Sequence, residues 1–265
     1  TLRRSSAASD VYKRQGSVTS AQNIIKCCNQ AGLDVEDIVL EPLASSQAVL
    51  SPDEQEVGVV LVDIGGGTTD ITIYSEGSIV HTAVLALGGN HLTHDIAIGL
   101  GTPLQEAEEI KHSDGIALSD MTDENEMIAV PSVGGRNNRQ MKKMVLAGII
   151  EDRFREIFEL IGREIEKTHY HKLMASGVVI TGGSCIMPGV DQLAHQVLNM
   201  PVRVGFPEHI SGLKELIYSP KYATSVGLVR YGITSNQGKL NFVGDETNLF
   251  HKVSRRMKDW MQDFF

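Results

Sequence analysis

A run of three glycines, followed by two threonines and flanked on each side by an aspartate, is the part of this sequence best suited to chemistry. The residues concerned are Asp63, Gly65, Gly66, Gly67, Thr68, Thr69 and Asp70. Adjacent glycines let backbone N–H groups point into a concavity and allow a bulky anion to approach closely. The threonines add hydroxyl donors, and the carboxylates stand where a cation or a water molecule would sit. This chemistry predicts a site for the phosphate tail of a nucleotide; the alternative is a plain glycine-rich hairpin turn.

The elements that must position these residues are two strands. The apolar run Val59–Val62 precedes the glycines and a second run, Ile71–Tyr74, follows them, so the pattern predicts a β-hairpin with the glycines at its tip. A P-loop would need G-x-x-x-x-G-K-[ST] opening a helix, and no such string occurs. The dinucleotide fingerprint also fails, because a strand rather than a helix follows the glycines. The D-x-G-G-G-T-x-D hairpin resembles the second phosphate loop of the actin, Hsp70 and sugar-kinase superfamily.

A second glycine turn lies about a hundred residues later. Val178–Thr181 is a short β-branched strand, Gly182 and Gly183 form a turn, and Ser184 is placed to cap the helix predicted over Val190–Leu198. A strand, a Gly-Gly turn and a helix start make a flat backbone shelf on which a planar base can lie. This segment resembles the adenosine motif of the same superfamily.

Two helices of small residues fit the resemblance. Glu41–Leu50 follows a strand predicted over Ile38–Leu40 and has a proline in its first turn. It resembles the first connecting helix of the superfamily, which implies that Glu41 orients a metal or a water; a capped helix with an incidental glutamate is the alternative. Ala223–Gly232 resembles the second connecting helix.

An acidic and a basic side chain share one face of a further predicted helix. Glu108 and Lys111 are three residues apart within Ala107–Gly115. The segment resembles the superfamily helix that contacts nucleotide, which implies that both residues meet ribose and base. A solvent-exposed salt bridge is the alternative.

Length and composition are those of a globular protein with one large domain or two smaller ones. The chain has 265 residues, and it contains no apolar run of eighteen residues and no cleavable signal pattern, so we expect a cytoplasmic body. Cys27, Cys28 and Cys185 have no metal-ligand spacing and are expected to be buried thiols.

The first fifteen residues do not read as natural protein. Ser5–Gln15 looks like the translation of a sequencing-library adapter, and natural sequence is expected to begin near Gly16, inside a helix over Val18–Gln30. Residues 1–15 carry a charge of +3 within a net charge of −9, so the remaining chain carries −12. This acidic body argues against nucleic acid as a partner. The superfamily has a first phosphate loop near its natural N-terminus, and no such loop occurs in this sequence. The resemblance therefore implies a fragment that lacks the first lobe.

The middle of the chain is expected to be a helix-rich subdomain inserted between two parts of a sheet subdomain. The predicted elements are a strand over Ile79–Leu87, helices over Leu92–Gly99 and Thr102–His112, a strand over Met127–Val130 and a helix over Met141–Lys167. The apolar residues of this last helix fall on one stripe, namely Ile149, Ile150, Phe154, Ile157, Phe158, Ile161 and Ile165. The division that follows is 1–15 adapter-derived, 16–94 first sheet part, 95–168 inserted subdomain, 169–233 second sheet part, 234–248 polar tether and 249–265 amphipathic helix.

The last seventeen residues form a basic amphipathic pattern. The expected apolar stripe is Leu249, Phe250, Val253, Met257, Trp260, Met261, Phe264 and Phe265, and the basic residues off it are Lys252, Arg255, Arg256 and Lys258. Bulky apolar residues beside basic ones, after a flexible tether, predict a helix lying in the plane of an anionic membrane. The alternative is a terminal helix docked on its own domain or in a partner groove.

Together these features resemble the FtsA family of bacterial cell-division proteins. The resemblance implies the second lobe of an α/β, actin-like (ribonuclease H-like) fold, an ATP and Mg2+ site, and a filament-forming adaptor. It further implies that FtsZ and other divisome proteins are partners at the cytoplasmic face of the inner membrane, at the division septum. Asp63 would position metal and water as the catalytic acid, Gly65 to Thr69 would hold phosphates, and Gly182 to Ser184 would hold adenosine. FtsZ would dock on 95–168, where Arg136 is a candidate contact or an ordinary surface arginine.

Other functions remain open on the sequence. A soluble ATPase or kinase of the superfamily would use Asp63 as a base, and a pilus-assembly actin homologue would share both glycine turns but lack the basic tail. A chaperone would need a β domain after the second lobe. ATP hydrolysis is expected to be weak or absent.

Overall fold

The computed structural model describes residues 18–134, 137–168, 170, 174–208 and 214–240. The chain divides into two compact units, 1–228 and 229–265, of which the second is described only by the end of one helix. The helices are α2 Val18–Gln30, α3 Glu41–Val49, α4 Pro52–Val57, α5 Gly89–Leu100, α6 Leu104–Asp114, α7 Lys143–Glu166, α8 Val190–Leu198, α9 Lys214–Ile217 and α10 Ala223–Leu240, with short 3-10 turns η1 Ser119–Met121, η3 Gly183–Ile186 and η4 Pro220–Tyr222. The strands are β1 Val59–Ile64, β2 Thr69–Ser75, β3 Ser78–Leu85, β4 Met127–Val130, β5 Arg139–Lys142, β6 Val178–Thr181 and β7 Val202–Val204.

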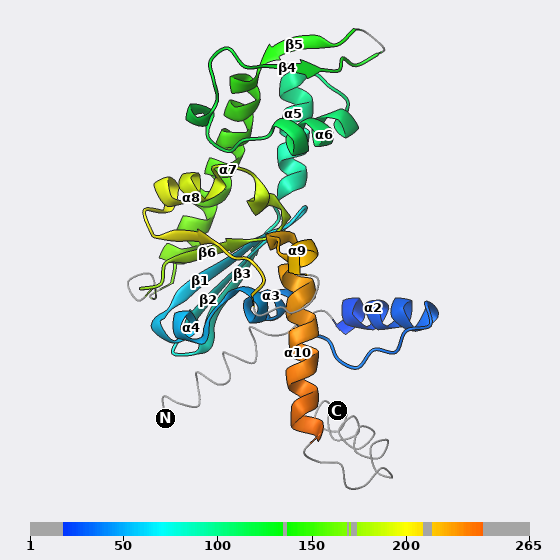
Figure 1. The fold of residues 1–265 in the computed structure, drawn as a ribbon. Helices are drawn as coiled ribbons and strands as arrows, with labels where there is room; N and C mark the ends of the chain where they lie inside the picture. The colour runs from blue at the N-terminus through cyan, green and yellow to red at the C-terminus, as the bar shows by residue number, and fades with distance from the viewer. Residues whose placement is uncertain (1–17, 135–136, 169, 171–173, 209–213, 241–265) are drawn as a thin grey trace. The chain divides into compact units, whose positions relative to one another are not determined.

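The central sheet has five strands in the order β3-β2-β1-β6-β7 (Figure 1). β1 and β2 form the predicted hairpin, with Asp63 opposite Asp70 at its tip. β1 is buried along its whole length, as expected for an apolar run in the middle of a sheet that is covered on both faces.

Parallel pairing of β1 with β6 brings the two glycine turns together. Asp63 lies opposite Thr181 in this pair, so both strands end at the same edge of the sheet. The turns that follow them, Gly65–Gly67 and Gly182–Gly183, therefore meet there although more than a hundred residues separate them in the chain. This edge is where open α/β sheets usually bind ligands.

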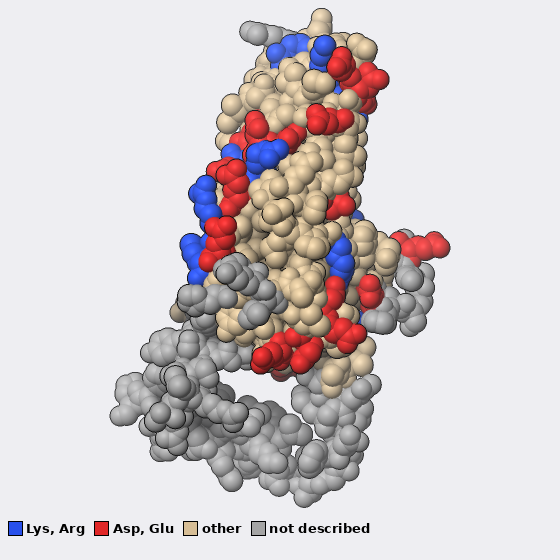
Figure 2. Space-filling view, turned by 90° about the vertical axis from the view of Figure 1, so that its left-hand side faces the viewer, with Lys and Arg blue, Asp and Glu red and all other residues tan. Residues whose placement is uncertain are grey.

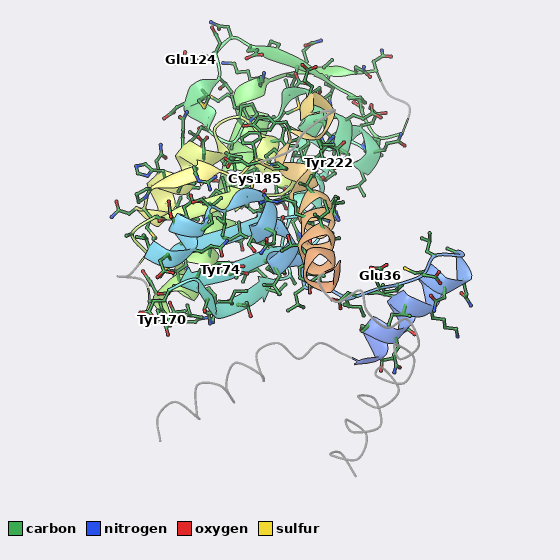
Figure 3. The ribbon with its side chains drawn as sticks, turned by 60° about the horizontal axis from the view of Figure 1, so that its bottom comes forward. Glu36, Tyr74, Glu124, Tyr170, Cys185 and Tyr222 are labelled. Carbon is green, nitrogen blue, oxygen red and sulfur yellow. The ribbon has the colours of Figure 1, made fainter. Side chains whose placement is uncertain are left out.

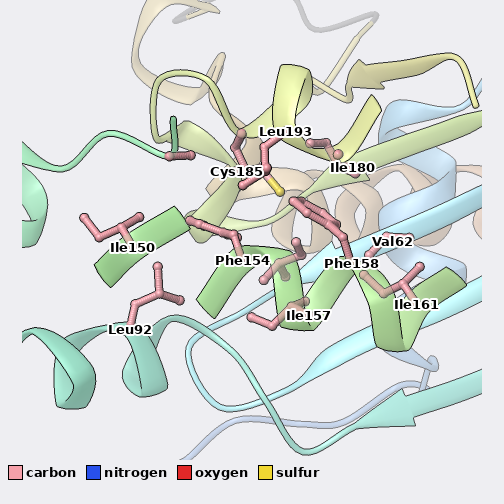
Figure 4. Close-up of a cluster of buried hydrophobic side chains, with 14 of the residues drawn as sticks. Val62, Leu92, Ile150, Phe154, Ile157, Phe158, Ile161, Ile180, Cys185 and Leu193 are labelled. Atoms are coloured by element: carbon pink, nitrogen blue, oxygen red, sulfur yellow. The ribbon is translucent and has the colours of Figure 1, made fainter. Parts of the chain in front are cut away.

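The segment between β3 and β6 holds α5, α6, η1, the β4–β5 hairpin and α7. The buried stripe of α7 consists of Leu146, Ala147, Ile150, Phe154, Ile157, Phe158, Ile161 and Ile165. Except for Ala147, these side chains pack with β1, β6, α5 and α8 in the main core (Figure 4). Each fully buried side chain of this size stabilises the fold by about 1.5–3 kcal/mol, so α7 anchors the inserted subdomain to the sheet.

Ion pairs occupy the outer side of α7. The pairs within the helix are Arg153–Glu156, Arg155–Glu151, Arg163–Glu159 and Lys167–Glu164. The space-filling view likewise shows basic and acidic side chains next to one another along one edge, with uncharged surface beside them (Figure 2). The amphipathic pattern predicted for this helix is thus confirmed.

Several predicted elements differ from the structure at their boundaries. α7 begins at Lys143 rather than Met141, because Arg139–Lys142 pairs with β4 as a strand that was not predicted. α5 begins at Gly89, three residues before the predicted start. The strand predicted over Ile38–Leu40 is absent: Ile38 and Leu40 are exposed, and none of the strands that the structure describes pairs with them. Cys185 is buried as expected, whereas Cys27 is exposed.

Helices α3 and the start of α10 cross at very close range. A Cβ atom on Gly227 would lie 1.7 Å from the carbonyl oxygen of Ala44, so their backbones touch. On the other side of α3, the hydroxyl of Tyr74, which Figure 3 labels, donates a 2.7 Å hydrogen bond to Ser46 Oγ. The two helices therefore cross in close contact, which the small residues of α3 allow.

The end of the described chain is helical. α10 continues to Leu240 and so includes the first residues of the segment expected to be a tether, 234–248. The predicted membrane helix, 249–265, and the candidate contact Arg136 lie outside the described residues. Among the helices that the structure does describe, none is long and apolar enough to cross a membrane.

Candidate functional site

A cavity of about 470 Å3 opens at the edge of the sheet where the glycine turns meet. Predicted site residues that line it are Gly65, Gly66, Glu108, Lys111, Gly183 and Ser184. They come from the β1–β2 hairpin, α6 and η3. The structure therefore brings together the phosphate hairpin, the glutamate–lysine pair and the base shelf, which the sequence presents as three separate motifs.

The phosphate hairpin turns its carbonyl groups toward the protein. The carbonyl oxygens of Gly65 and Gly66 accept hydrogen bonds of 2.9 and 2.8 Å from the amides of Gly89 and Asn90. Within the described residues, no protein group accepts a hydrogen bond from the amides of Gly66 and Gly67. Two adjacent backbone donors beside a cavity suit an anion such as a phosphate.

Thr69 does not add a donor to this site. Its side chain is buried, and its hydroxyl donates a 2.8 Å hydrogen bond to the carbonyl of Leu87. The phosphate-binding hydroxyl predicted for Thr69 is therefore wrong: because Thr69 lies in β2, its side chain points to the interior. The neighbouring Thr68 is exposed, and its hydroxyl donates to Asp70 Oδ2 at 3.3 Å.

The glutamate–lysine pair forms one wall of the cavity. Lys111 Nζ donates to Glu108 Oε2 at 2.7 Å, to Thr93 Oγ1 at 2.8 Å and to the Gly89 carbonyl at 3.2 Å. The Lys111 side chain is only 10% exposed, against 42% for Glu108. Burial raises the pKa of Glu108, but hydrogen bonds from Lys111 and Thr93 outweigh it and hold the pKa below its usual value. Glu108 is thus a fixed anion able to accept from ribose hydroxyls.

The Gly182–Ser184 turn, called the base shelf here, follows β6. Gly182 has a φ of +95°, and a Cβ there would lie 2.5 Å from the carbonyl oxygen of Ile64, so only glycine fits. Ser184 does not cap the next helix, contrary to prediction. It lies in η3, and its hydroxyl donates a 3.1 Å hydrogen bond to the Gly65 carbonyl, whereas Gly189 occupies the cap position of α8.

A buried acid lies behind the phosphate hairpin. Asp63 is 5% exposed and accepts a 2.7 Å hydrogen bond from Ser45 Oγ. Burial raises the pKa of Asp63 to about 6, the Ser45 hydrogen bond opposes this rise, and the charges of Glu41 and Asp70 add to it. A buried carboxyl group with a raised pKa is suited to hold a water molecule or to face a cation.

Glu41 is linked to this acid through hydroxyl groups. Thr224 Oγ1 lies 3.0 Å from Ser45 Oγ and donates to Glu41 Oε1 at 3.5 Å. Glu41 itself is exposed at the first position of α3. The route from Glu41 to Asp63 therefore crosses both connecting helices.

The carboxylates of Asp63 and Asp70 suit a metal ion that is held mainly by a bound nucleotide. Burial raises the pKa of Asp70, and the charge of Glu41 adds to this rise while the Thr68 hydrogen bond opposes it. Among the described residues, no three His, Cys, Asp or Glu side chains converge closely enough to hold a metal ion. Mg2+ typically binds one or two carboxylates together with phosphates and waters, so this donor set fits Mg2+ carried by a nucleotide.

Sequence reasoning missed several residues of the site. They are Ser45, Asn90, Thr93, Met187, Lys221 and Thr224. Asn90 lies at the start of α5 and Lys221 lies in η4, outside the motifs that were recognised in the sequence. Met187 is inside the G-G-S-C-I-M-P-G segment, but its side chain was not singled out. Ser45 and Thr224 could have been found from the sequence, because each places a hydroxyl within a helix of small residues. A buried hydroxyl at such a position needs a hydrogen-bond partner.

The chain matches one family model, described as "Cell division protein FtsA", over residues 60–227. Among curated relatives, it is 43% identical over 255 residues to "Cell division protein FtsA" of Pseudomonas aeruginosa, covering 94% of this chain and 61% of that protein. It is 40% identical over 216 residues to the protein of the same description from Bacillus subtilis, covering 82% of this chain and 48% of that protein. The chain thus spans about three fifths or less of the length of these relatives.

Solved structures share the fold at low sequence identity. MreB5 of Spiroplasma citri bound to ADP superimposes with a TM-score of 0.69 at 18% identity, over 86% of this chain and 69% of that one. A chain of the PilM–PilN type IV pilus biogenesis complex gives 0.60 at 18% identity, over 80% of this chain and 57% of that one. The fold is therefore actin-like, as predicted.

Proposed function

The chain belongs to the FtsA family of cell division proteins, and on this basis we propose that it is part of an ATP-binding, actin-like adaptor that holds FtsZ polymers at the cytoplasmic face of the inner membrane. The observation that carries the proposal is the 43% identity to the Pseudomonas aeruginosa protein over 94% of this chain. The cavity supplies the nucleotide part of the proposal. The sequence of residues 249–265 supplies the membrane part.

The nucleotide is proposed to lie along the cavity from η3 to the β1–β2 hairpin. A volume of about 470 Å3 is within the usual range of about 300–1,000 Å3 for small-molecule sites. The base would rest on the shelf at Gly183 and Met187, the ribose hydroxyls would donate to Glu108, and the phosphates would accept from the amides of Gly66 and Gly67. MreB5 of Spiroplasma citri, which shares the fold, has been crystallised with ADP and with AMPPNP.

Bound Mg2+ would neutralise the phosphate charge beside Asp63 and Asp70. Asp63, fixed by Ser45, would then orient a water near the terminal phosphate, and Glu41 would assist from the end of α3. The nucleotide is proposed to act mainly as a structural and switching ligand, with weak or absent hydrolysis.

Membrane attachment is proposed to depend on self-association. The tail carries four basic residues against two acidic ones, and attraction to anionic lipid is worth about 1 kcal/mol for each basic residue near the surface. A single tail would therefore bind modestly, whereas several tails on one polymer gain affinity through their high effective concentration.

The test is co-sedimentation with lipid vesicles. The full chain and a version ending at Asn248 are mixed with anionic or neutral vesicles, with and without FtsZ. We expect the full chain to pellet with anionic vesicles and to carry FtsZ with it, and the shortened chain to leave both proteins in the supernatant. FtsZ that pellets equally without the chain, or a full chain that ignores anionic lipid, contradicts the adaptor function.

A soluble ATPase or kinase of the same superfamily is the second candidate. The fold shared with the PilM–PilN complex equally allows a pilus-assembly homologue. All three functions predict binding of a fluorescent ATP analogue, but the two alternatives predict no vesicle binding that depends on residues 249–265. A chain that binds the ATP analogue and does not pellet with anionic vesicles would therefore favour them over the adaptor.

A further inference from the structure

The carbonyl oxygen of Gly65 joins three segments that are far apart in the sequence. It accepts a hydrogen bond from the Gly89 amide at 2.9 Å and from Ser184 Oγ at 3.1 Å. Gly65 belongs to the phosphate hairpin, Gly89 begins α5, and Ser184 lies in the base shelf. One acceptor therefore fixes the mutual position of the hairpin, the inserted subdomain and the shelf.

The backbones at this junction are too close for side chains. A Cβ on Gly88 would lie 2.6 Å from the Gly65 carbonyl oxygen, and one on Gly89 would lie 2.7 Å from Ser184 Oγ. Contacts under 3 Å require something to move. The two glycines thus allow α5 to start directly against the hairpin, within reach of the serine hydroxyl.

The junction also determines which way the hairpin amides point. With the carbonyls of Gly65 and Gly66 held against α5, the amides of Gly66 and Gly67 have no acceptor among the described protein groups. A rotation of the Gly65–Gly66 peptide group would turn the Gly65 carbonyl toward the cavity and the Gly66 amide away from it. A hydroxyl bonded to that carbonyl opposes this rotation.

We propose that Ser184 is a positioning residue for the phosphates: it acts through the Gly65 carbonyl and keeps the Gly66 amide facing the cavity. This rests on the proposed nucleotide site but differs from the role expected from the sequence, in which Ser184 contacts adenosine. Loss of the hydroxyl weakens binding of ligands that carry phosphates and leaves the affinity for adenosine unchanged.

The experiment compares Ser184→Ala with Ser184→Thr, which keeps the hydroxyl. Ser119→Ala is the matched control, because Ser119 Oγ also donates a tertiary hydrogen bond, to Glu151 Oε2 at 2.6 Å, outside the cavity. The first measurement is hydrogen–deuterium exchange of the full chain without nucleotide, resolved at Gly65, Gly89 and Asn90. The second is equilibrium binding of ATP, ADP and adenosine.

Ser184→Ala is expected to speed exchange at the Gly89 amide by about fivefold, the change that corresponds to one neutral hydrogen bond. It is also expected to weaken ATP and ADP binding by a similar factor, while Ser184→Thr and Ser119→Ala leave these values near wild type. Unchanged exchange at Gly89, or an equal loss of adenosine affinity, overturns the proposal. If the wild-type chain binds neither ATP nor ADP, the nucleotide function fails, whereas the exchange result still tests the junction.

Discussion

Gly182 lies directly against Asp63: a Cβ on Gly182 would come within 2.5 Å of Asp63 Oδ1. The start of the base shelf and the buried acid behind the phosphate hairpin therefore touch across the parallel pair β1–β6. A change at one position must disturb the other, so the proposed nucleotide site and the stability of the fold are coupled at this contact.

Gly182→Ala is expected to lower the free energy of unfolding by about 2–4 kcal/mol, since it combines a positive φ with contact against backbone and carboxylate. Gly183→Ala is the control, because its φ is ordinary and the nearest atom to a Cβ is Lys221 Cβ at 3.9 Å. Urea unfolding followed by circular dichroism measures both. Equal stability of the two variants would contradict the close contact with Asp63.

The Asp63→Asn variant should become more stable, relative to the wild-type chain, as the pH rises. The folded pKa of Asp63, about 6, exceeds the reference value of 3.8, so protonation favours the folded state. This stabilisation is complete below pH 3.8 and is lost as the pH rises through about 6. Asparagine stays neutral at every pH. The unfolding free energy of the variant, minus that of the wild-type chain, is therefore expected to rise by about 3 kcal/mol between pH 3.5 and pH 7.5. A difference that does not vary with pH would refute a raised pKa.

Gly227→Ala is expected to separate α3 from α10. Because its Cβ would lie 1.7 Å from a backbone oxygen of Ala44, no side-chain rotation can relieve the contact, and we expect a loss of about 3 kcal/mol or more. Gly232→Ala on the same helix meets nothing within 4 Å and should be neutral or stabilise by up to about 1 kcal/mol. Thermal unfolding of both variants tests this, and similar melting temperatures would contradict the crossing.

Lys111→Met is expected to weaken ATP binding by about tenfold or more. The change leaves Glu108 and the Gly89 carbonyl without their shared donor, and an unpaired partly buried group costs about 1–3 kcal/mol. Lys143→Met is the control, since its partner Glu126 is 43% exposed and lies just before β4, outside the cavity lining. Isothermal titration calorimetry with ATP compares them, and an equal effect of both changes would argue against Lys111 as a site residue.

Local signals allowed the hairpin, the Gly-Gly turn and the apolar stripe of α7 to be predicted correctly, because each depends on residues that are neighbours in sequence. The strand predicted over Ile38–Leu40 is absent because a strand requires a partner strand, which a local apolar run does not reveal. Similarly, β5 was missed because Arg139–Lys142 is polar and forms a strand only beside β4.

The direction in which each side chain of the site points could not be predicted from the sequence. Thr69 has the residue type of a phosphate donor, yet its place in β2 turns its hydroxyl to Leu87. Ser45 and Thr224 are 179 residues apart, so their contact appears only once the two connecting helices cross. Such long-range partners follow from the packing of the whole sheet and cannot be derived from either helix alone.

The position of β6 in the chain has a consequence for synthesis. β1 pairs with β2 almost at once, but Val178, the start of its other neighbour, comes 114 positions after Ile64. At about 5–20 residues per second, a ribosome needs roughly 6–23 s to produce that stretch. During this interval one edge of a strand that is apolar except for Asp63 stays unpaired, which is a condition that favours aggregation. The inserted segment thus sets how long this edge of β1 stays unpaired in the nascent chain.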